Sequence, residues 1–270
     1  MAFDHCLKNG EILMMQQAHV SIGNIEYAYG FGVYETIRVV HGAPVFLKQH
    51  LDRLFLSAGI IGLTHALTEG TIHTWIGALI QATKADTCNL KILLIGGRTA
   101  EDATLWILPL TPLFPDKKLY RDGVATITVS HERFLPHAKT LNMLPSYLFY
   151  GKAKEAGCYD ALLMDRHGNL TEGTRTNLLA IKDRTILSPP THDILEGVMR
   201  ANVLNVATKH GFDMREEILP LSHVDSYDGF FLTSTSSKIL PIRKIDDHEL
   251  SIPEALRELM RSFDAFLLFS

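Results

Sequence analysis

The stretch GVYETIRVVHGAPVFL, residues 32–47, carries the clearest structural signal in the chain. β-Branched and aromatic residues stand on both sides of His41 and Gly42, which is typical of two extended strands joined by a tight turn. The next stretch, KQHLDRLFLSAGI, spaces its apolar residues as a helix does, and we expect that helix to end at Gly59. A hairpin followed directly by a helix indicates mixed sheets rather than a purely parallel one.

The same mixture of elements continues along the chain. We expect helices over 68–84, after Pro145, near 195–210 and from Pro253. We expect strands in LKILLIGG, TLWILPL, DALLMD, TNLLAI, GFFLTST and ILPIRKI. Three prolines within PLTPLFPDKK, residues 109–118, predict a linker. The sequence therefore predicts a two-domain α+β chain, with an N-terminal α/β domain over 1–115 and a C-terminal domain over 119–270.

Composition narrows the class of protein. The chain has 270 residues, of which 46% are hydrophobic and 21% charged, and its net charge of -4 offers no basic field for nucleic acid or a membrane surface. No apolar run approaches the roughly 20 residues needed to span a bilayer. The three cysteines are scattered, and the N-terminus lacks the layout of a signal peptide. Neither HExxH nor GxSxG occurs, so we expect a cytoplasmic enzyme that is neither a zinc protease nor a serine hydrolase.

Lys139 is the first candidate for chemistry. It lies in HAKTLNMLPS, residues 137–146, next to several apolar side chains. Carbon atoms around the ammonium would lower the pKa of this lysine and favour the neutral amine. A neutral amine is suited to forming a Schiff base with an aldehyde. The alternative is a surface lysine near the start of a helix.

Four further segments carry polar groups that suit an anionic ligand. Glu172, in NLTEGTRTN, is expected in a polar turn between two strands, aimed either at a ligand or at solvent. Arg53, in HLDRL, lies off the apolar stripe of its helix, so the spacing alone places it in solvent, although its planar fork could hold a phosphate. Gly197 lies close to a helix start, where free amides bind anions. The hydroxyl groups of TSTSS, residues 233–237, follow a buried strand. Together these segments suggest a phosphorylated aldehyde cofactor.

These segments resemble, in order, those of the fold-type IV pyridoxal-phosphate enzymes, the class IV aminotransferases. YGFGVYETIRV resembles the family's first strand over the active site, HLDRLFLSA its phosphate-arginine segment and KTLNML its Schiff-base lysine segment. LTEGTRTNL is similar to its glutamate segment, and ILEGVMR and LTSTSSKILPI are similar to its two phosphate-binding turns. Each motif is degenerate alone, but six in this order along nearly the whole chain form a specific pattern.

The resemblance implies a fold, a cofactor and roles for individual residues. It implies a two-domain enzyme with its active site between the domains, in which Lys139 binds pyridoxal 5'-phosphate and then moves the proton at the substrate α-carbon. Glu172 would pair with the pyridinium nitrogen. The phosphate would be held by Arg53, the backbone amides of Val198 and Met199, and Thr235. The family also implies a homodimer, whose sites are completed by a loop of the neighbouring subunit.

The resemblance leaves the substrate open. The best-known D-amino-acid transaminases hold the α-carboxylate with an Arg-x-His pair that the loop GGRTAEDA lacks. Branched-chain enzymes have a glycine pair and a tyrosine after the lysine, where this chain has TLNML, and Tyr34 is a candidate substitute for that tyrosine. Arg175, Arg38 and Arg98 are candidates for the carboxylate clamp. A transaminase for D-amino acids is favoured slightly over one for branched-chain L-amino acids. An aminodeoxychorismate lyase, which shares KTLN, and an R-selective amine transaminase are alternatives. A binding protein without catalysis would have to carry Lys139 and Glu172 by chance.

Overall fold

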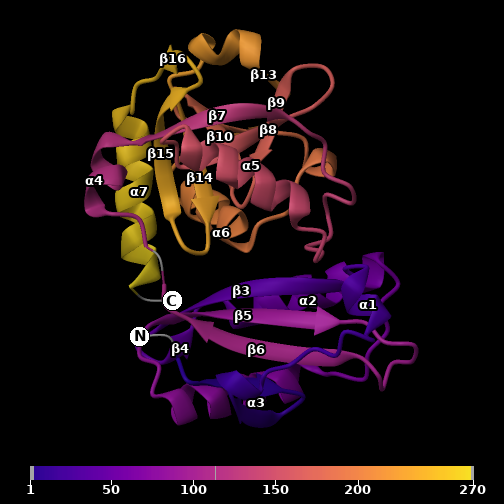
Figure 1. Cartoon of the computed structure of the whole chain (residues 1–270). Helices are drawn as coiled ribbons and strands as arrows, with labels where there is room; N and C mark the ends of the chain where they lie inside the picture. The colour runs from indigo at the N-terminus through magenta and orange to yellow at the C-terminus, as the bar shows by residue number, and fades with distance from the viewer. Residues whose placement is uncertain (1–2, 113, 269–270) are drawn as a thin grey trace. The chain divides into compact units, whose positions relative to one another are not determined.

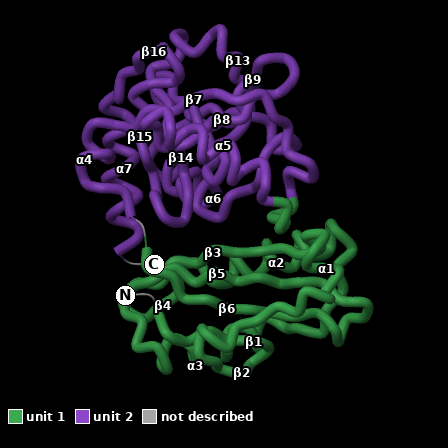
Figure 2. Tube along the Cα trace, viewed as in Figure 1, with its two compact units in different colours: residues 1–113, 138–142 green, residues 114–137, 143–270 purple. Residues whose placement is uncertain are grey.

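The chain folds into two compact units. The computed structural model describes residues 3–112 and 114–268. Unit 1 consists of Met1–Leu113 together with the short segment Ala138–Asn142, and unit 2 consists of Phe114–His137 and Met143–Ser270. Figure 2 shows the two units in different colours. The described residues contain no helix long and apolar enough to cross a membrane.

Unit 1 is built on a six-stranded antiparallel sheet of order β2-β1-β6-β5-β3-β4. Its strands are β1 His5–Lys8, β2 Glu11–Met14, β3 Gly32–Val40, β4 Ala43–Pro44, β5 Cys88–Ile95 and β6 Thr104–Leu110. The expected hairpin is confirmed, because β3 pairs with β4 across His41 and Gly42, which both have positive φ angles. The mixed sheet expected from the sequence does not occur in this unit.

Two helices of unit 1, α2 Leu47–Ile60 and α3 Glu69–Thr83, bury the apolar side of this sheet (Figure 1). The short helix α1 Ile25–Ala28 has no buried residue. Leu51 and Leu54 of α2 share one core with Ile37 of β3. The prediction that α2 ends at Gly59 is wrong, because the helix continues to Ile60 and the chain turns at Gly62, whose φ is +70°.

Unit 2 is built on a ten-stranded mixed sheet of order β12-β11-β10-β14-β15-β7-β8-β9-β13, with β16 beside β15. Its strands are β7 Val124–Ser130, β8 Asp160–Met164, β9 Asn169–Gly173, β10 Asn177–Lys182, β11 Thr185–Ser188, β12 Asp213–Glu216, β13 Leu219–Pro220, β14 Gly229–Ser234, β15 Lys238–Ile245 and β16 His248–Glu249. The pairs β11–β12, β15–β7 and β7–β8 are parallel, and the other pairs are antiparallel. The expected mixed sheet is therefore confirmed here.

Six strands of unit 2 form a closed ring of pairings. Within the sheet the order runs β10-β14-β15-β7-β8-β9, and β9 also pairs with β10 through Glu172 and Asn177. Closure removes the exposed edges of both strands at this point. The helices of this unit are α4 Lys117–Asp122, α5 Leu144–Glu155, α6 Val198–Lys209 and α7 Glu254–Leu267.

The domain boundaries expected from the sequence differ from the two units at two places. Residues 109–118 are not a free linker throughout, because Pro109 lies in β6 and Lys117 begins α4, while Leu113 is outside the described residues. The segment Ala138–Asn142, expected in the second domain, belongs to unit 1. Its backbone bonds to β3 explain the difference, since the Tyr34 amide donates to the Lys139 carbonyl and the Leu141 amide to the Gly32 carbonyl.

Candidate active site

Lys139 is fixed against β3 and α2 of unit 1 by its backbone. Its amide donates a 3.1 Å hydrogen bond to Ser57 Oγ, and its carbonyl accepts from the Tyr34 amide at 2.9 Å. Thr140 pairs with Val33 as an isolated antiparallel bridge. A lysine held on both sides by backbone bonds presents its side chain from a defined point, which a catalytic amine requires.

The ammonium of Lys139 lies over an aromatic ring. Its Nζ is 4.4 Å from the centroid of Tyr34, and the Nζ of Lys91 is 3.9 Å from the same centroid. From the sequence we expected apolar side chains around the ammonium of Lys139. One of the apolar residues of this segment, Leu144, is instead exposed. Burial lowers the pKa of Lys91, and the charge of Lys139 lowers it further, whereas Tyr34 and Glu35 raise it. Lys91 was missed, although a lysine inside the apolar strand LKILLIGG was a visible signal.

Arg53 is held in a buried cluster and does not lie in solvent. Its Nε donates to Glu35 Oε1 at 2.6 Å and its Nη2 to Glu35 Oε2 at 2.8 Å, while His50 Nδ1 lies 2.9 Å from Glu35 Oε2. The Arg53 side chain is 11% exposed. The solvent position suggested by its helical spacing is therefore wrong, because Glu35 lies on the buried face of β3 and draws the guanidinium inward.

The charges in this cluster fix one another. Burial alone would raise the pKa of Glu35, but the Arg53 charge and the hydrogen bonds from His50 and Arg53 outweigh it and lower the pKa to about 2. Burial lowers the pKa of His50, against the opposing effect of Glu35. The carboxylate thus remains ionised and holds Arg53 in one orientation, as a rigid anion receptor requires.

Glu172 lies in a strand of unit 2 and not in the polar turn expected from the sequence. It is 2% exposed and forms the pair with Asn177 that closes the ring of strands. Arg133 Nε donates to Glu172 Oε1 at 2.6 Å, and the Leu195 amide donates to Oε2 at 3.2 Å. Each carboxylate oxygen therefore has a donor that fixes its direction. Arg133 and Leu195 were not identified from the sequence, because both lie at least 20 residues away along the chain.

The first predicted anion-binding turn is the start of α6 in unit 2. The predicted position of Gly197 close to a helix start is confirmed, since it is the N-cap of this 12-residue helix, and Val198 and Met199 are the first buried residues. A Cβ on Gly197 would lie 2.0 Å from Asn177 Oδ1, so only glycine fits beside that amide. The Asn177 Nδ2 group in turn donates to the Leu195 carbonyl at 2.6 Å. The same asparagine thus ties this turn to the strand that neighbours Glu172.

The second predicted turn follows β14. Thr235 is half-buried in the turn, where the Ser237 amide donates to Ser234 Oγ at 3.1 Å. The Thr233 hydroxyl, in a residue 1% exposed, is buried and has no hydrogen-bond partner among residues 3–112 and 114–268. A buried hydroxyl without a partner is costly unless a ligand or water satisfies it. A polar ligand at this turn fits that requirement.

The three candidate carboxylate-binding arginines lie in different surroundings. Arg175 is exposed in the turn after β9, and its guanidinium carbon stacks 3.6 Å from the ring centroid of Tyr150. The buried Asp160 shapes this turn by accepting hydrogen bonds from Thr174 and Thr176. Arg38 is half-buried in β3, four positions after Tyr34 and on the same face. Arg98 is exposed in the loop after β5.

Comparison with known proteins gives one family. The family model described as amino-transferase class IV matches residues 32–245. D-alanine aminotransferase of Bacillus licheniformis is 29% identical over 252 residues, which cover 89% of this chain and 88% of that protein. A putative branched-chain-amino-acid aminotransferase of Methanocaldococcus jannaschii is 29% identical over 274 residues, covering 94% and 93%.

Solved structures share the fold. The branched-chain aminotransferase of Thermoproteus uzoniensis, crystallised with norvaline, superposes with a TM-score of 0.89 at 22% identity, covering 98% of this chain and 95% of that one. A hypothetical aminotransferase of Mycobacterium tuberculosis in a PLP-bound form gives 0.86 at 21% identity, covering 97% and 98%. At these identities the likeness concerns the fold.

Proposed function

Because the chain belongs to the class IV aminotransferase family, we propose that it is a pyridoxal-phosphate-dependent transaminase that moves an amino group between an α-amino acid and a 2-keto acid. The observation that carries the proposal is Lys139, whose backbone is bonded to Ser57 and Tyr34 and whose ammonium lies over the Tyr34 ring. A lysine anchored in this way is suited to bind an aldehyde covalently.

The described residues fit this cofactor. Within the described part of the chain the buried Thr233 hydroxyl has no partner, and it lies beside a turn rich in hydroxyl groups that follows a buried strand. From unit 2, Thr235 and the amides of Val198 and Met199 would hold the phosphate, and Glu172 would hold the ring nitrogen. From unit 1, Arg53 would add a guanidinium to the phosphate and Lys139 would bind the aldehyde carbon. A cation, amides and hydroxyls suit a phosphate, and a fixed carboxylate suits a protonated ring nitrogen.

Individual side chains of the protein would have separate roles in the reaction. When bound, the cofactor supplies an aldehyde for the amine and a ring that accepts electrons from the substrate α-carbon. Lys139 would act as the base that removes the proton from the substrate α-carbon. It would then act as the acid that returns a proton to the carbon of the cofactor's former aldehyde group. Glu172, fixed by Arg133, would keep a proton on the ring nitrogen. Glu35 would keep Arg53 oriented and thereby prevent rotation of the phosphate.

We further propose that the substrate is an α-amino acid, with D-amino acids ahead of branched-chain L-amino acids. A D-alanine aminotransferase and a putative branched-chain-amino-acid aminotransferase each match at 29% identity. Further D-alanine aminotransferases are also among the relatives. A desolvated substrate carboxylate needs a cation. Arg175 supports an α-amino acid because it lies three residues after Glu172 and its guanidinium is positioned by Tyr150. Lys91, whose ammonium lies over the Tyr34 ring, and Arg38, on the same face of β3 as Tyr34, are further cations for a carboxylate.

A half-reaction screen tests the proposal. Purified protein loaded with pyridoxal phosphate is mixed with D-amino acids, L-amino acids and (R)-amines, and the cofactor absorption is followed. The proposal expects rapid conversion with D-alanine or a related D-amino acid, and restoration by a 2-keto acid. Conversion by (R)-amines alone would overturn the substrate class. Pyruvate release from aminodeoxychorismate without a keto-acid acceptor would make the protein a lyase.

A further inference from the structure

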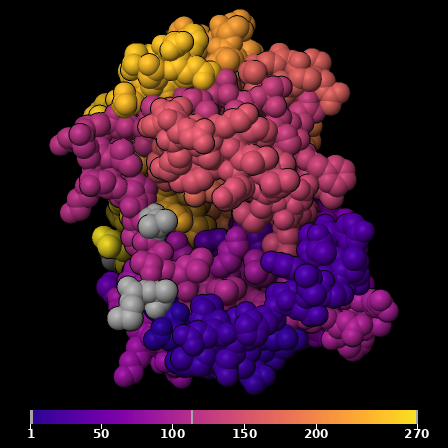
Figure 3. All heavy atoms as spheres, in the orientation of Figure 1, coloured from indigo at the N-terminus to yellow at the C-terminus, as the bar shows by residue number. Residues whose placement is uncertain are grey.

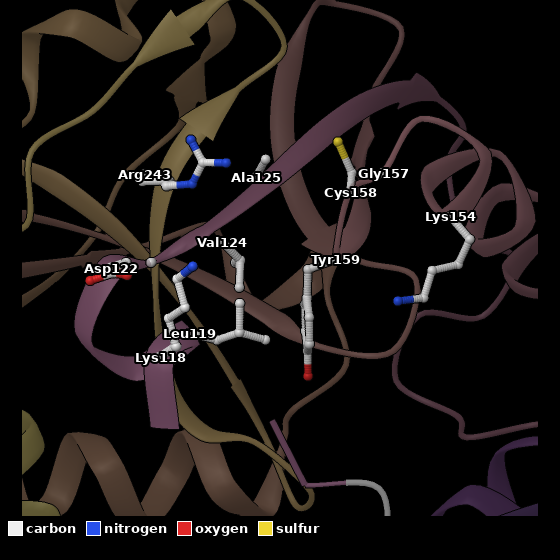
Figure 4. Close-up of a pocket in the computed structure, with 11 residues that line it drawn as sticks. Lys118, Leu119, Asp122, Val124, Ala125, Lys154, Gly157, Cys158, Tyr159 and Arg243 are labelled. Atoms are coloured by element: carbon white, nitrogen blue, oxygen red, sulfur yellow. The ribbon is translucent and has the colours of Figure 1, made fainter. Parts of the chain in front are cut away.

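Unit 2 contains a cavity that none of the cofactor or substrate residues lines. Its volume is about 510 Å³, within the range of roughly 300–1,000 Å³ that small-molecule sites occupy. Its walls come from four segments, namely α4, the start of β7, the end of α5 with the chain that follows it, and β15 (Figure 4). Because these segments are distant in sequence, the cavity belongs to the folded unit and not to one loop.

Three cations surround this cavity. Lys118 comes from α4, Lys154 from α5 and Arg243 from β15. Among the described residues none of the three forms an ion pair, whereas the lining carboxylate, Asp122, is held by both Nε and Nη2 of Arg121. Three like charges around one cavity raise its positive potential, which a bound anion would relieve.

The floor of the cavity is apolar and fixed. Leu119, Val124 and the ring of Tyr159 line it, and Figure 4 shows the Tyr159 ring between Leu119 and the amino group of Lys154. The Tyr159 amide donates a 2.8 Å hydrogen bond to the carbonyl of Ala125, which fixes the residue against the start of β7. An apolar wall with a few charged groups at its rim is typical of a site for a small organic molecule.

We propose that this cavity binds a small organic phosphate, whose apolar part packs on Tyr159 and Leu119 and whose phosphate groups contact Lys118, Lys154 and Arg243. A ligand with several negative charges matches three cations better than a single carboxylate does. Arginine and lysine side chains are also the common protein partners of phosphate oxygens. The apolar floor excludes inorganic phosphate as the best occupant, since it would leave that floor exposed to water.

Cys158 provides a readout that does not depend on turnover. It lines the cavity and is half-buried, while Cys6 and Cys88 are both fully buried. Burial raises the pKa of the Cys158 thiol, and Arg243 lowers it. Alkylation by iodoacetamide at about pH 8, near the ordinary thiol pKa, can therefore be followed at this residue by mass spectrometry. For each variant, the rate of Cys158 alkylation with ligand is compared with the rate of the same variant without ligand. This is needed because loss of Arg243 also changes the rate in the absence of ligand.

The experiment uses protein saturated with pyridoxal phosphate, so that the protein groups assigned above to the cofactor phosphate are already occupied. The probes are ATP, inorganic triphosphate and adenosine. We expect ATP at millimolar concentration to slow Cys158 alkylation at least fivefold, triphosphate to protect less and adenosine not at all. Lys118→Gln and Arg243→Gln should each abolish protection by ATP. Lys209→Gln, an exposed lysine at the end of α6, should leave it unchanged.

Three results would overturn the proposal. One is the absence of protection by ATP in the natural protein. The second is equal protection by ATP in Lys118→Gln, Arg243→Gln and the natural protein, which would place the anion elsewhere. The third is protection by adenosine alone, which would show an apolar site without a role for the cations. The outcome is independent of transamination, so failure of the proposed enzymatic activity would not decide it.

Discussion

Glu35 holds a buried charged cluster that cannot be predicted from the sequence pattern. Glu35 lies on the buried face of β3, and burying a carboxylate is unfavourable unless it is paired. Its partners, His50 and Arg53, lie on α2, so the cluster forms only when the helix packs on the strand. Sequence spacing therefore identified Arg53 as a candidate but could not place it, because the residue that places it is 18 positions away.

Acid should destabilise the protein through Glu35. Its pKa falls from 4.5 to about 2 in the folded state, so the unfolded state binds more protons between these values. The stabilisation is complete above about pH 4.5 and is lost as the pH falls toward 2. We expect Glu35→Gln to lower the free energy of unfolding at pH 7 by on the order of 3 kcal/mol, since Arg53 loses its buried partner.

The measurement is urea denaturation of both proteins at pH 7 and pH 3.5. The difference between them should shrink at the lower pH, because Glu35 of the unfolded natural protein is largely protonated at pH 3.5 while the folded protein still holds it ionised. Asp52→Asn is the matched control on α2, since Asp52 forms an exposed pair with Lys48 and should cost less than about 1 kcal/mol. An identical difference at both pH values would show that Glu35 is not ionised in the folded protein.

Arg175→Ala should separate amino acids from amines. If its guanidinium holds the substrate carboxylate, the variant should raise KM for D-alanine about 10-fold or more, corresponding to the roughly 1.4 kcal/mol of one charged hydrogen bond. Turnover of a primary amine and affinity for the cofactor should stay nearly unchanged. Arg215→Ala is the matched control, because Arg215 is also exposed and is not among the arginines considered for the substrate carboxylate. Equal losses for amino acids and amines would make Arg175 structural.

At the level of elements, the strands and helices with strong patterns were predictable and β9 was not. The sequence NLTEG begins with Asn and ends with Gly, two residues that favour a turn over a strand. It becomes a strand because β8 and β13 pair with it on its two sides and Glu172 pairs with Asn177 of β10. Long-range pairing thus overrides the local preference. This pairing buries Glu172 beside donors from Arg133 and Leu195, which no local pattern marks.

Gly197→Ala should disrupt the start of α6. The added methyl group would overlap Asn177 Oδ1, so the bond from Asn177 to the Leu195 carbonyl must break or the helix must shift. We expect a loss of about 2–4 kcal/mol in the free energy of unfolding, as for other overpacked buried sites. Thermal unfolding measures it. Gly151→Ala on α5 is the control, because nothing lies within 4 Å and alanine favours a helix. A stable Gly197→Ala would show that Asn177 does not constrain this turn.

At the scale of the whole chain, the division into two units could be predicted from the sequence. That the segment Ala138–Asn142 belongs to the first unit could not. Ala138–Asn142 lies about 100 residues after β3 in the sequence, yet it is bonded to that strand. No local signal marks such a pairing, because it depends on where both segments arrive after folding. The lysine could therefore be identified from the sequence, while its partners, Ser57 and Tyr34, required the structure.

The protein is also predicted to form a homodimer. Tyr147 and Leu148 of α5 are 76% and 52% exposed in the single chain, and α5 lies on the face of unit 2 that Figure 3 shows. A second copy would bury apolar side chains of this kind. Light scattering after size-exclusion chromatography at micromolar concentration should give twice the mass of one chain. A monomeric mass together with full activity would contradict the prediction.

The most direct test of the account is to find which lysine binds the cofactor. The protein is incubated with pyridoxal phosphate, reduced with borohydride, dialysed, digested and mapped by mass spectrometry. The account predicts the added mass on the peptide that contains Lys139, and neither label nor turnover in Lys139→Ala. Lys91 is the internal control, because its ammonium lies over the same tyrosine ring. A label on Lys91, or no stable label on any lysine, would contradict the assignment of Lys139.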